Sequence, residues 1–214
     1  MNIQILVDNP SSWIIPYAKK LNDILIQSGH NSQLIHKHEE IRYGDCLFLL
    51  SCEKKLGSDL RLLHTYNLVV HESDLPKGRG WSPMTWQVLD GKNTIPITLL
   101  EAADGIDSGD IFIRDNFQLQ GHELVEELRI AQGEATIDIV LKFITEINYI
   151  KAIPQKGEPS SYPRRRPQDS KLDVNKCIKE QFNLLRVCDN ERYPAYFELN
   201  GQKYIIKITK EEKL

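Results

Sequence analysis

The chain has 214 residues, of which 41% are hydrophobic and 27% are charged, and its formal net charge is -3. This balance is ordinary for a soluble globular protein, and nothing in it draws the chain to nucleic acid or to an anionic membrane. No apolar run reaches the roughly 18–20 residues that span a bilayer. The N-terminal segment "MNIQILVDNP" lacks the pattern of a secretory signal. We therefore expect a cytoplasmic protein without membrane or nucleic-acid partners.

The four cysteines are too scattered to form a metal site or a redox motif. No two of them form a CxxC pair, and no histidines cluster with them. In a cytoplasmic protein they are expected to be small, reduced core residues. The four are Cys46, Cys52, Cys177 and Cys188.

The first third of the chain alternates apolar strands with helices. A strand over 3–7 precedes turn residues and a helix over about 13–28, with Ser11 or Ser12 as its N-cap and Gly29 as its C-cap. Three further strands are predicted over 32–36, 45–51 and 67–71, and a short helix over 57–63 lies between the last two. This rhythm predicts a Rossmann-like α/β fold with an open, mainly parallel twisted sheet, helices on both faces, and ligands at the carboxyl ends of the strands.

The rest of the chain completes this domain and adds a small subdomain. A helix over 83–89, strands over 94–102 and 110–117, and an amphipathic helix over 122–147 complete a first domain of residues 1–150. A connector rich in Pro, Ser and charge is predicted over 151–172. Residues 173–214 are predicted to form a helix to about Arg186 and a β-hairpin with a type I′ turn at Asn200-Gly201. The apolar stripe of that helix is Ile178, Phe182 and Leu185.

The segment "HESDLPKGRGWSP" directly follows the strand that ends at His71. Taken alone, His71 is more often a structural residue, and Asp107 in "GIDSGDI" a turn-former. Together with "ITLLEAADGIDSGDI", however, the segment resembles the core of the formyltransferases that use 10-formyltetrahydrofolate, over about residues 67–115. The matching positions are His71, Ser73, Leu75, Pro76, Arg79, Gly80, Pro83, Thr98, Asp107 and Gly109.

The resemblance implies a reaction and a set of residues for it. Formyl transfer needs an amine nucleophile, stabilisation of an oxyanion and movement of a proton, and a histidine suits the proton step. By resemblance, His71 takes the acid/base and oxyanion role and Asp107 supports it. The loop after the strand would line the site, and contacts with 10-formyltetrahydrofolate are expected from Ser73, Leu75, Arg79, Gly80 and Leu100.

Contacts with the formyl acceptor are expected at a second turn. The segment "DNPSSW" places free N–H groups at a helix N-terminus, where a phosphate can bind, although an ordinary N-cap reads the same way. The expected contacts are Asn9, Ser11, Ser12 and Trp13, together with Lys77.

One position departs from the family pattern. Where the family has an asparagine that polarises the formyl oxygen, this chain has Val69. Losing such a donor costs on the order of 10²–10³ in rate if nothing replaces it. Asn67 faces the same side of the strand as His71, but it lies about 13 Å away along the strand. A backbone N–H, an ordered water or a doubly protonated His71 remain as replacements.

The acceptor expected from the resemblance is an amino sugar. Members acting on methionyl-tRNA carry a larger basic C-terminal domain, whereas the basic cluster "PRRRP" reads here as a solvated segment. Purine-pathway members resemble a bare catalytic domain. The helix–hairpin tail resembles sugar formyltransferases of pseudaminic acid-type pathways for bacterial surface glycans, which implies a nucleotide-linked 4-amino-4,6-dideoxy sugar, with UDP favoured over dTDP.

The oligomeric state and two alternative functions remain open at this point. An exposed hairpin edge favours a homodimer in which the tails of two copies pair. Hydrolysis of 10-formyltetrahydrofolate would use the same fold with water as the acceptor. A non-catalytic binding module would explain Val69.

Overall fold

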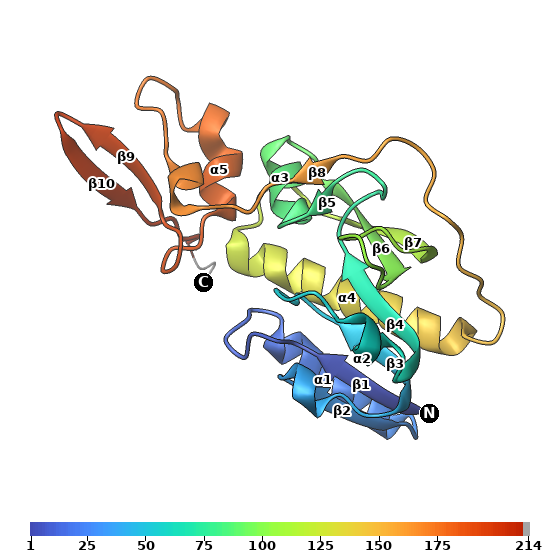
Figure 1. Ribbon diagram of the computed structural model, residues 1–214. Helices are drawn as coiled ribbons and strands as arrows, with labels where there is room; N and C mark the ends of the chain where they lie inside the picture. The colour runs from blue at the N-terminus through green and yellow to red at the C-terminus, as the bar shows by residue number, and fades with distance from the viewer. Residues whose placement is uncertain (212–214) are drawn as a thin grey trace.

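A six-stranded sheet forms the centre of the computed structural model, which describes residues 1–211 (Figure 1). The first four strands in the order are parallel, β6 is antiparallel to β4, and β7 is antiparallel to β6. The predicted mainly parallel, Rossmann-like α/β fold is confirmed. In spatial order the strands are β2 (Asn31–Ile35), β1 (Asn2–Leu6), β3 (Gly44–Leu49), β4 (His64–His71), β6 (Thr94–Glu101) and β7 (Ile111–Gln118).

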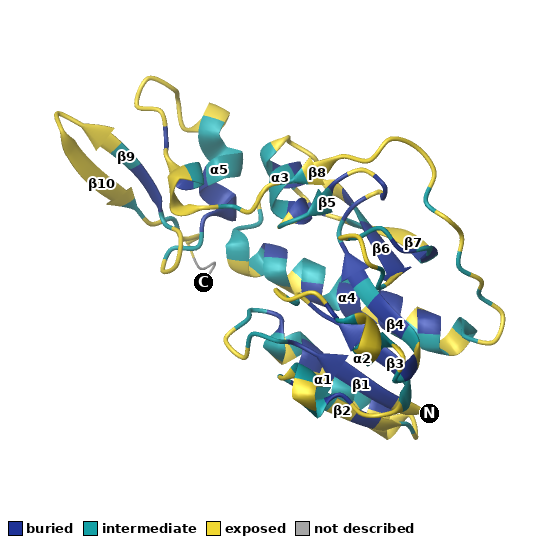
Figure 2. Ribbon diagram, viewed as in Figure 1, coloured by how far each residue is buried: buried dark blue, intermediate teal, exposed yellow. Residues whose placement is uncertain are grey.

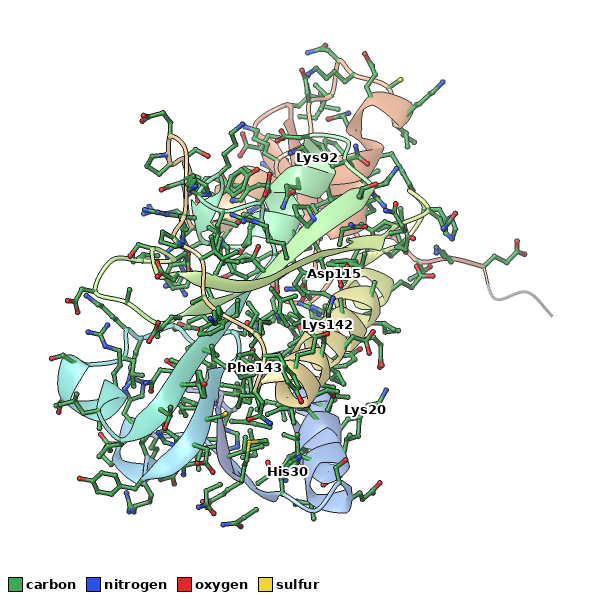
Figure 3. All side chains as sticks on the ribbon, turned by 90° about the vertical axis from the view of Figure 1, so that its right-hand side faces the viewer. Lys20, His30, Lys92, Asp115, Lys142 and Phe143 are labelled. Atoms are coloured by element: carbon green, nitrogen blue, oxygen red, sulfur yellow. The ribbon has the colours of Figure 1, made fainter. Side chains whose placement is uncertain are left out.

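One face of the sheet is covered by two long helices, α1 (Ile15–Gln27) and α4 (Val125–Glu146). Phe143 of α4 is fully buried and makes edge-on aromatic contacts with Phe48 of β3 and Phe112 of β7. Figure 3 views α4 from its side, where Lys142 ion-pairs with Asp115 of β7. Aromatic side chains bury large apolar areas, so this cluster fixes α4 on the sheet.

The other face carries shorter elements, η1 (His38–Glu40) and α2 (Ser58–Arg61). Leu6, Leu47 and Leu49 of the sheet pack here against partly buried residues of the loop before α2 and of α2 itself.

The segment after α4 returns across the molecule. It forms paired backbone hydrogen bonds between Ile153 and Ile111, and then β8 (Ser161–Tyr162) pairs in parallel with β5 (Arg79–Gly80) beside α3 (Pro83–Leu89) (Figure 1). The predicted connector is therefore joined by hydrogen bonds to the loop that follows His71.

The tail packs on the α3 and α4 end of the molecule through α5 (Phe182–Val187). Arg186 is 1% exposed, and its guanidinium donates to Glu123 and Asn93. The hairpin of β9 (Ala195–Leu199) and β10 (Gln202–Ile206) extends away from the sheet, with its outer residues exposed (Figure 2). Asn200 and Gly201 have φ of 51° and 76°, which agrees with the predicted type I′ turn.

The predicted tail helix is wrong over its first half. Residues 173–178 form a loop, and the helical turns are η3 (Lys179–Gln181) and α5, after η2 (Pro167–Ser170). The Gln181 side chain accepts from the Asp173 N–H and donates to the Asp173 and Lys176 carbonyls, which closes the loop. Ile178 is 74% exposed and is not part of an apolar stripe.

Other boundaries differ by a few residues. The N-cap of α1 is Ile14, not Ser11 or Ser12, because Pro16 is suited to the first turn of the helix. The long helix begins at Val125 because the Glu127 carboxylate accepts from the Leu124 N–H.

The prediction for the cysteines holds in part. All four are free; Cys46 and Cys188 are buried and Cys52 is half-buried, but Cys177 is exposed, because it lies in the loop that replaces the predicted helix. Within residues 1–211, no helix combines the length and apolarity that crossing a bilayer requires.

Candidate active site

A cavity of about 540 Å³ opens where the carboxyl ends of β1, β3 and β4 meet. Its floor comes from the strand ends, and one wall comes from the first turns of α3 and α4. Further lining comes from the loop over 102–107 and from residues 164–166 and 192–193 of the C-terminal part. This is the position that the predicted sheet assigns to a ligand.

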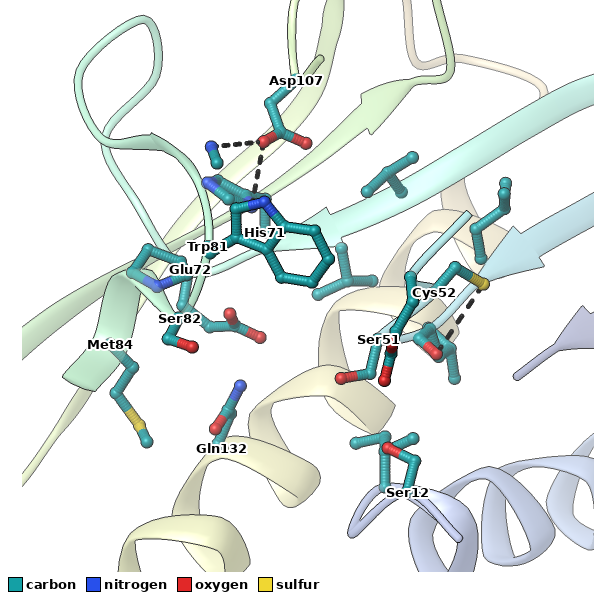
Figure 4. Close-up of a pocket in the computed structure, with 18 of the residues that line it drawn as sticks. Ser12, Ser51, Cys52, His71, Glu72, Trp81, Ser82, Met84, Asp107 and Gln132 are labelled. Carbon is teal, nitrogen blue, oxygen red and sulfur yellow. Dashed lines mark hydrogen bonds and ion pairs between the residues drawn. The ribbon is translucent and has the colours of Figure 1, made fainter. Parts of the chain in front are cut away.

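His71 ends β4 at the floor of this cavity and is 6% exposed. Its Nε2 lies 2.8 Å from the Gly78 carbonyl oxygen, and its Nδ1 lies 3.6 Å from Oδ2 of Asp107 (Figure 4). A carbonyl oxygen only accepts, so Nε2 carries a proton in this arrangement. Nδ1 is left facing a carboxylate.

Asp107 is held in place from two sides. Its Oδ2 accepts a 2.8 Å hydrogen bond from the Gly80 N–H, and its own carbonyl accepts from the Gln155 side chain at 2.8 Å. Its φ of 48° lies in the left-handed region, where a non-glycine residue is uncommon. The residues predicted to act together therefore meet in the fold, with the carboxylate fixed beside the imidazole.

No asparagine side chain replaces the missing one within residues 1–211. Val69 lies in the cavity wall next to Leu100 of β6. Asn67 does not line this cavity, and its amide donates to the Arg61 and His64 carbonyls. The separation expected along the strand is therefore confirmed.

The other predicted loop residues divide into two groups. Gly80 and Leu100 line the cavity. Gly80 has a φ of 96°, and the Tyr162 carbonyl oxygen lies 2.7 Å from the point that a Cβ would occupy, so this position has no room for a side chain. The four that do not line the cavity in this structure are Ser73, Leu75, Lys77 and Arg79.

Those four residues support the loop or face solvent. The Ser73 carbonyl accepts from Thr98 Oγ1, and Leu75 packs in a small apolar cluster. Lys77 is exposed, and Arg79 donates to Gln155 at 2.6 Å. These four side chains do not line the cavity in this structure, and their expected ligand contacts stay a prediction.

The first turn is placed largely as predicted. Asn9, Ser12 and Trp13 line the cavity, while Ser11 is exposed outside it. The Asn9 side-chain oxygen accepts from the Ser11 N–H, so this donor of the turn is already engaged.

Several cavity residues carried no signal in the sequence. Glu72 and Trp81 lie in the segment after β4, and Gln132 comes from α4; all three face the cavity (Figure 4). Arg164 lies with its guanidinium 4.5 Å from the Trp81 ring centroid. The "PRRRP" segment therefore lines the cavity while Arg164 and Arg166 stay exposed to solvent, as expected. The sequence could not indicate the lining, because it depends on the returning connector.

Comparison with known proteins gives one consistent class. No family model matches the chain. It is 30% identical over 152 residues to the methionyl-tRNA formyltransferase of Thermodesulfovibrio yellowstonii, an alignment covering 68% of this chain and 47% of that protein. The chain thus spans about half the length of that curated relative.

Solved structures match over nearly the whole chain. A methionyl-tRNA formyltransferase from Clostridium thermocellum gives a TM-score of 0.82 at 22% identity, covering 99% of this chain and 94% of that one. A 4-N formyltransferase from Francisella tularensis gives 0.75 at 18% identity, covering 99% and 98%. The chain has the fold of the formyltransferases. Over about two-thirds of its length it also resembles methionyl-tRNA formyltransferases in sequence.

Proposed function

We propose that the chain is an N-formyltransferase that moves a formyl group from 10-formyltetrahydrofolate to the amine of a nucleotide-linked amino sugar. The observation that carries this proposal is the pairing of His71 and Asp107 at the floor of the cavity, 3.6 Å apart and largely shielded from water. A carboxylate that holds an imidazole in a cavity is suited to proton transfer at a reacting amine.

The cavity has room and lining for the one-carbon donor, which supplies an electrophilic formyl carbon. Val69, Leu100 and Ile106 provide an apolar surface for a flat ring close to His71. The donor that replaces the missing asparagine at the formyl oxygen would then come from a backbone N–H, an ordered water or the His71 ring.

The exposed basic residues of the cavity support an anionic acceptor. Three exposed arginines of the C-terminal part and two exposed lysines of the loop after β3 line the cavity, and they provide the charge that a diphosphate needs. Our specific proposal is a UDP-linked 4-amino-4,6-dideoxy sugar used for bacterial surface glycans of the pseudaminic acid type. The basic residues are Lys54, Lys55, Arg164, Arg166 and Arg192.

The test is a formylation assay with a panel of acceptors. The purified chain is incubated with 10-formyltetrahydrofolate and UDP- or dTDP-linked 4-amino sugars, with methionyl-tRNA as a rival acceptor, and products are followed by mass spectrometry. One formyl group on a sugar, absent with His71→Ala, supports the proposal.

Other outcomes of the assay identify the rivals. Formylation of methionyl-tRNA alone would overturn the sugar acceptor while keeping the reaction. Formate released without any acceptor would indicate a hydrolase, and ligand binding with no turnover would indicate a binding module.

We further propose a homodimer through the hairpin. Leu199, Tyr204 and Ile205 are 47%, 47% and 59% exposed on β9 and β10, which leaves apolar surface for a second copy. Light scattering after gel filtration should give twice the mass of the chain, and Ile205→Glu should reduce it to the mass of one chain.

A further inference from the structure

Glu72 is a cavity carboxyl that the roles given so far do not use. It follows His71 directly, at the point where β4 ends, and its side chain lines the same cavity. Among residues 1–211, no Lys, Arg or His nitrogen lies within 4.0 Å of its carboxyl oxygens. Glu72 is half-buried, and a nearby cation favours a carboxylate that is partly removed from water.

The neighbours of Glu72 are polar but give it no positive partner within the described residues. The Gln132 side chain of α4 points towards the carboxyl group (Figure 4) and lines the same cavity. His71 is the nearby group whose charge favours the carboxylate, and Asp107 opposes it. Arg129 of α4 also lines the cavity, but its guanidinium is bound to carboxylates of α4 and of the tail at 2.6 and 2.7 Å. Burial raises the pKa of Glu72.

The missing cation fits the proposed acceptor. A sugar amine is largely an ammonium ion at neutral pH, and it must lose a proton before it can attack a carbonyl carbon. The exposed lysines and arginines that line the same cavity fit the anionic part of the same molecule. The cavity thus offers both kinds of charge that the acceptor needs, a carboxyl group for its cation and basic side chains for its phosphates.

We infer that Glu72 binds the ammonium group of the formyl acceptor and takes its first proton, a role that rests on the proposed function. The ammonium gives a proton to the carboxylate, and the free amine attacks the formyl carbon. A C–N bond to the acceptor forms and the C–N10 bond of the donor breaks. The second proton leaves the new amide nitrogen and passes by way of His71 to N10, and Glu72 releases its proton to solvent. The products are the formamide, tetrahydrofolate and one proton.

The first experiment measures binding without turnover. Calorimetry in the presence of tetrahydrofolate compares the UDP-linked amino sugar with the same UDP-sugar bearing a hydroxyl in place of the amine. The wild type should prefer the amine. Glu72→Gln should lose that preference by about 10–100-fold, the value of a hydrogen bond to a charged group. Glu72→Asp should keep part of it.

The second experiment measures the pH dependence of kcat/KM. The wild type accepts the ammonium form, so its rate should change little while the amine stays protonated. The Glu72→Gln variant can use only the fraction of acceptor that is already a free amine in solution, so its kcat/KM should rise steadily with pH. Glu158→Gln, which removes an exposed carboxyl of the connector outside the cavity, is the matched control and should behave as the wild type.

The outcomes distinguish the role of Glu72 from the proposed function. A Glu72→Gln protein that melts cooperatively yet keeps the amine preference and the wild-type pH profile overturns this role of Glu72 and leaves the proposed function intact. A wild type that binds neither sugar and forms no formylated sugar overturns the proposed function and this inference with it.

Discussion

His71 lies between two hydrogen-bond acceptors, the Gly78 carbonyl and the Asp107 carboxylate. The contact with Gly78 puts a proton on Nε2, while Nδ1 stands 3.6 Å from the carboxylate, beyond hydrogen-bond distance. The proton-transfer role proposed for His71 is therefore linked to the negative charge that Asp107 places beside the ring.

Asp107→Asn tests that link. The amide oxygen can still accept from the Gly80 N–H, so the loop should keep its place. The negative charge beside the ring is lost, and we expect kcat to fall by about 10²–10⁴, the usual contribution of a placed proton-transfer group. Steady-state kinetics with circular dichroism checks this. An unchanged kcat would show that Asp107 is structural.

Glu72→Gln should also change stability, in a direction that depends on pH. Because burial raises the pKa of Glu72 above 4.5, the folded chain holds a proton that the unfolded chain releases. The wild type therefore loses stability as pH rises from about 4.5 through the raised value, and the Gln variant does not. Melting temperatures should diverge in favour of the variant at neutral pH. Parallel profiles for the two proteins would contradict this.

The predictability of single residues depended on how local their signal was. His71 and Asp107 were predictable because a strand end and a turn carry them in a recognisable order. Glu72 lies in the same segment, but nothing in the sequence indicated a role for it, since the sequence does not show that Gln132 of a distant helix lies beside it. Ser73 and Arg79 were assigned to the ligand, but the turn directs them into the loop.

At the level of elements, the connector fixes the Asp107 loop through one side chain. Gln155 donates to the Asp107 and Gly109 carbonyls at 2.8 and 2.9 Å and accepts from Arg79 at 2.6 Å. A segment that reads as an extended linker thereby becomes part of the support of the active site.

Gln155→Ala should loosen this support. We expect a loss of about 1–3 kcal/mol in the free energy of unfolding, because buried polar groups lose their partner. The kcat should fall as well, by less than in the Asp107 variant. Urea denaturation and kinetics measure the two effects. Gln168→Ala, at an exposed connector position, is the control. Equal behaviour of both variants would mean that Gln155 does not position the loop.

Strands and long helices were predictable because their apolar periodicity is continuous. The tail helix was predicted too long because a side chain, Gln181, competes for backbone groups of residues 173–176 that a helix would use. Helix propensity does not account for such a contact, since the hydrogen bond joins residues eight positions apart.

At the scale of the whole molecule, Arg186 fastens the tail to the body. It is 1% exposed and joins α5 to Glu123, at 3.1 Å, and to Asn93, at 3.0 Å. Breaking such a pair from one side leaves a carboxylate without its partner.

Arg186→Ala should cost about 3–5 kcal/mol of unfolding free energy. It should also lower activity, because the tail supplies Arg192 and Tyr193 to the cavity. Arg186→Ala combined with Glu123→Gln should recover part of the stability, since the unpaired charge is removed. Guanidinium denaturation checks both. A single variant with wild-type stability would show that the tail is held by apolar contacts alone.

The cavity takes its floor from residues before 108 and its exposed arginines from residues after 163. These two stretches can therefore diverge at different rates during evolution. Substitutions in the later stretch alter the charge that a ligand meets without changing His71 or Asp107. Grafting residues 161–211 from a homologue onto this body would replace one part of the ligand preference, while Lys54 and Lys55 keep theirs.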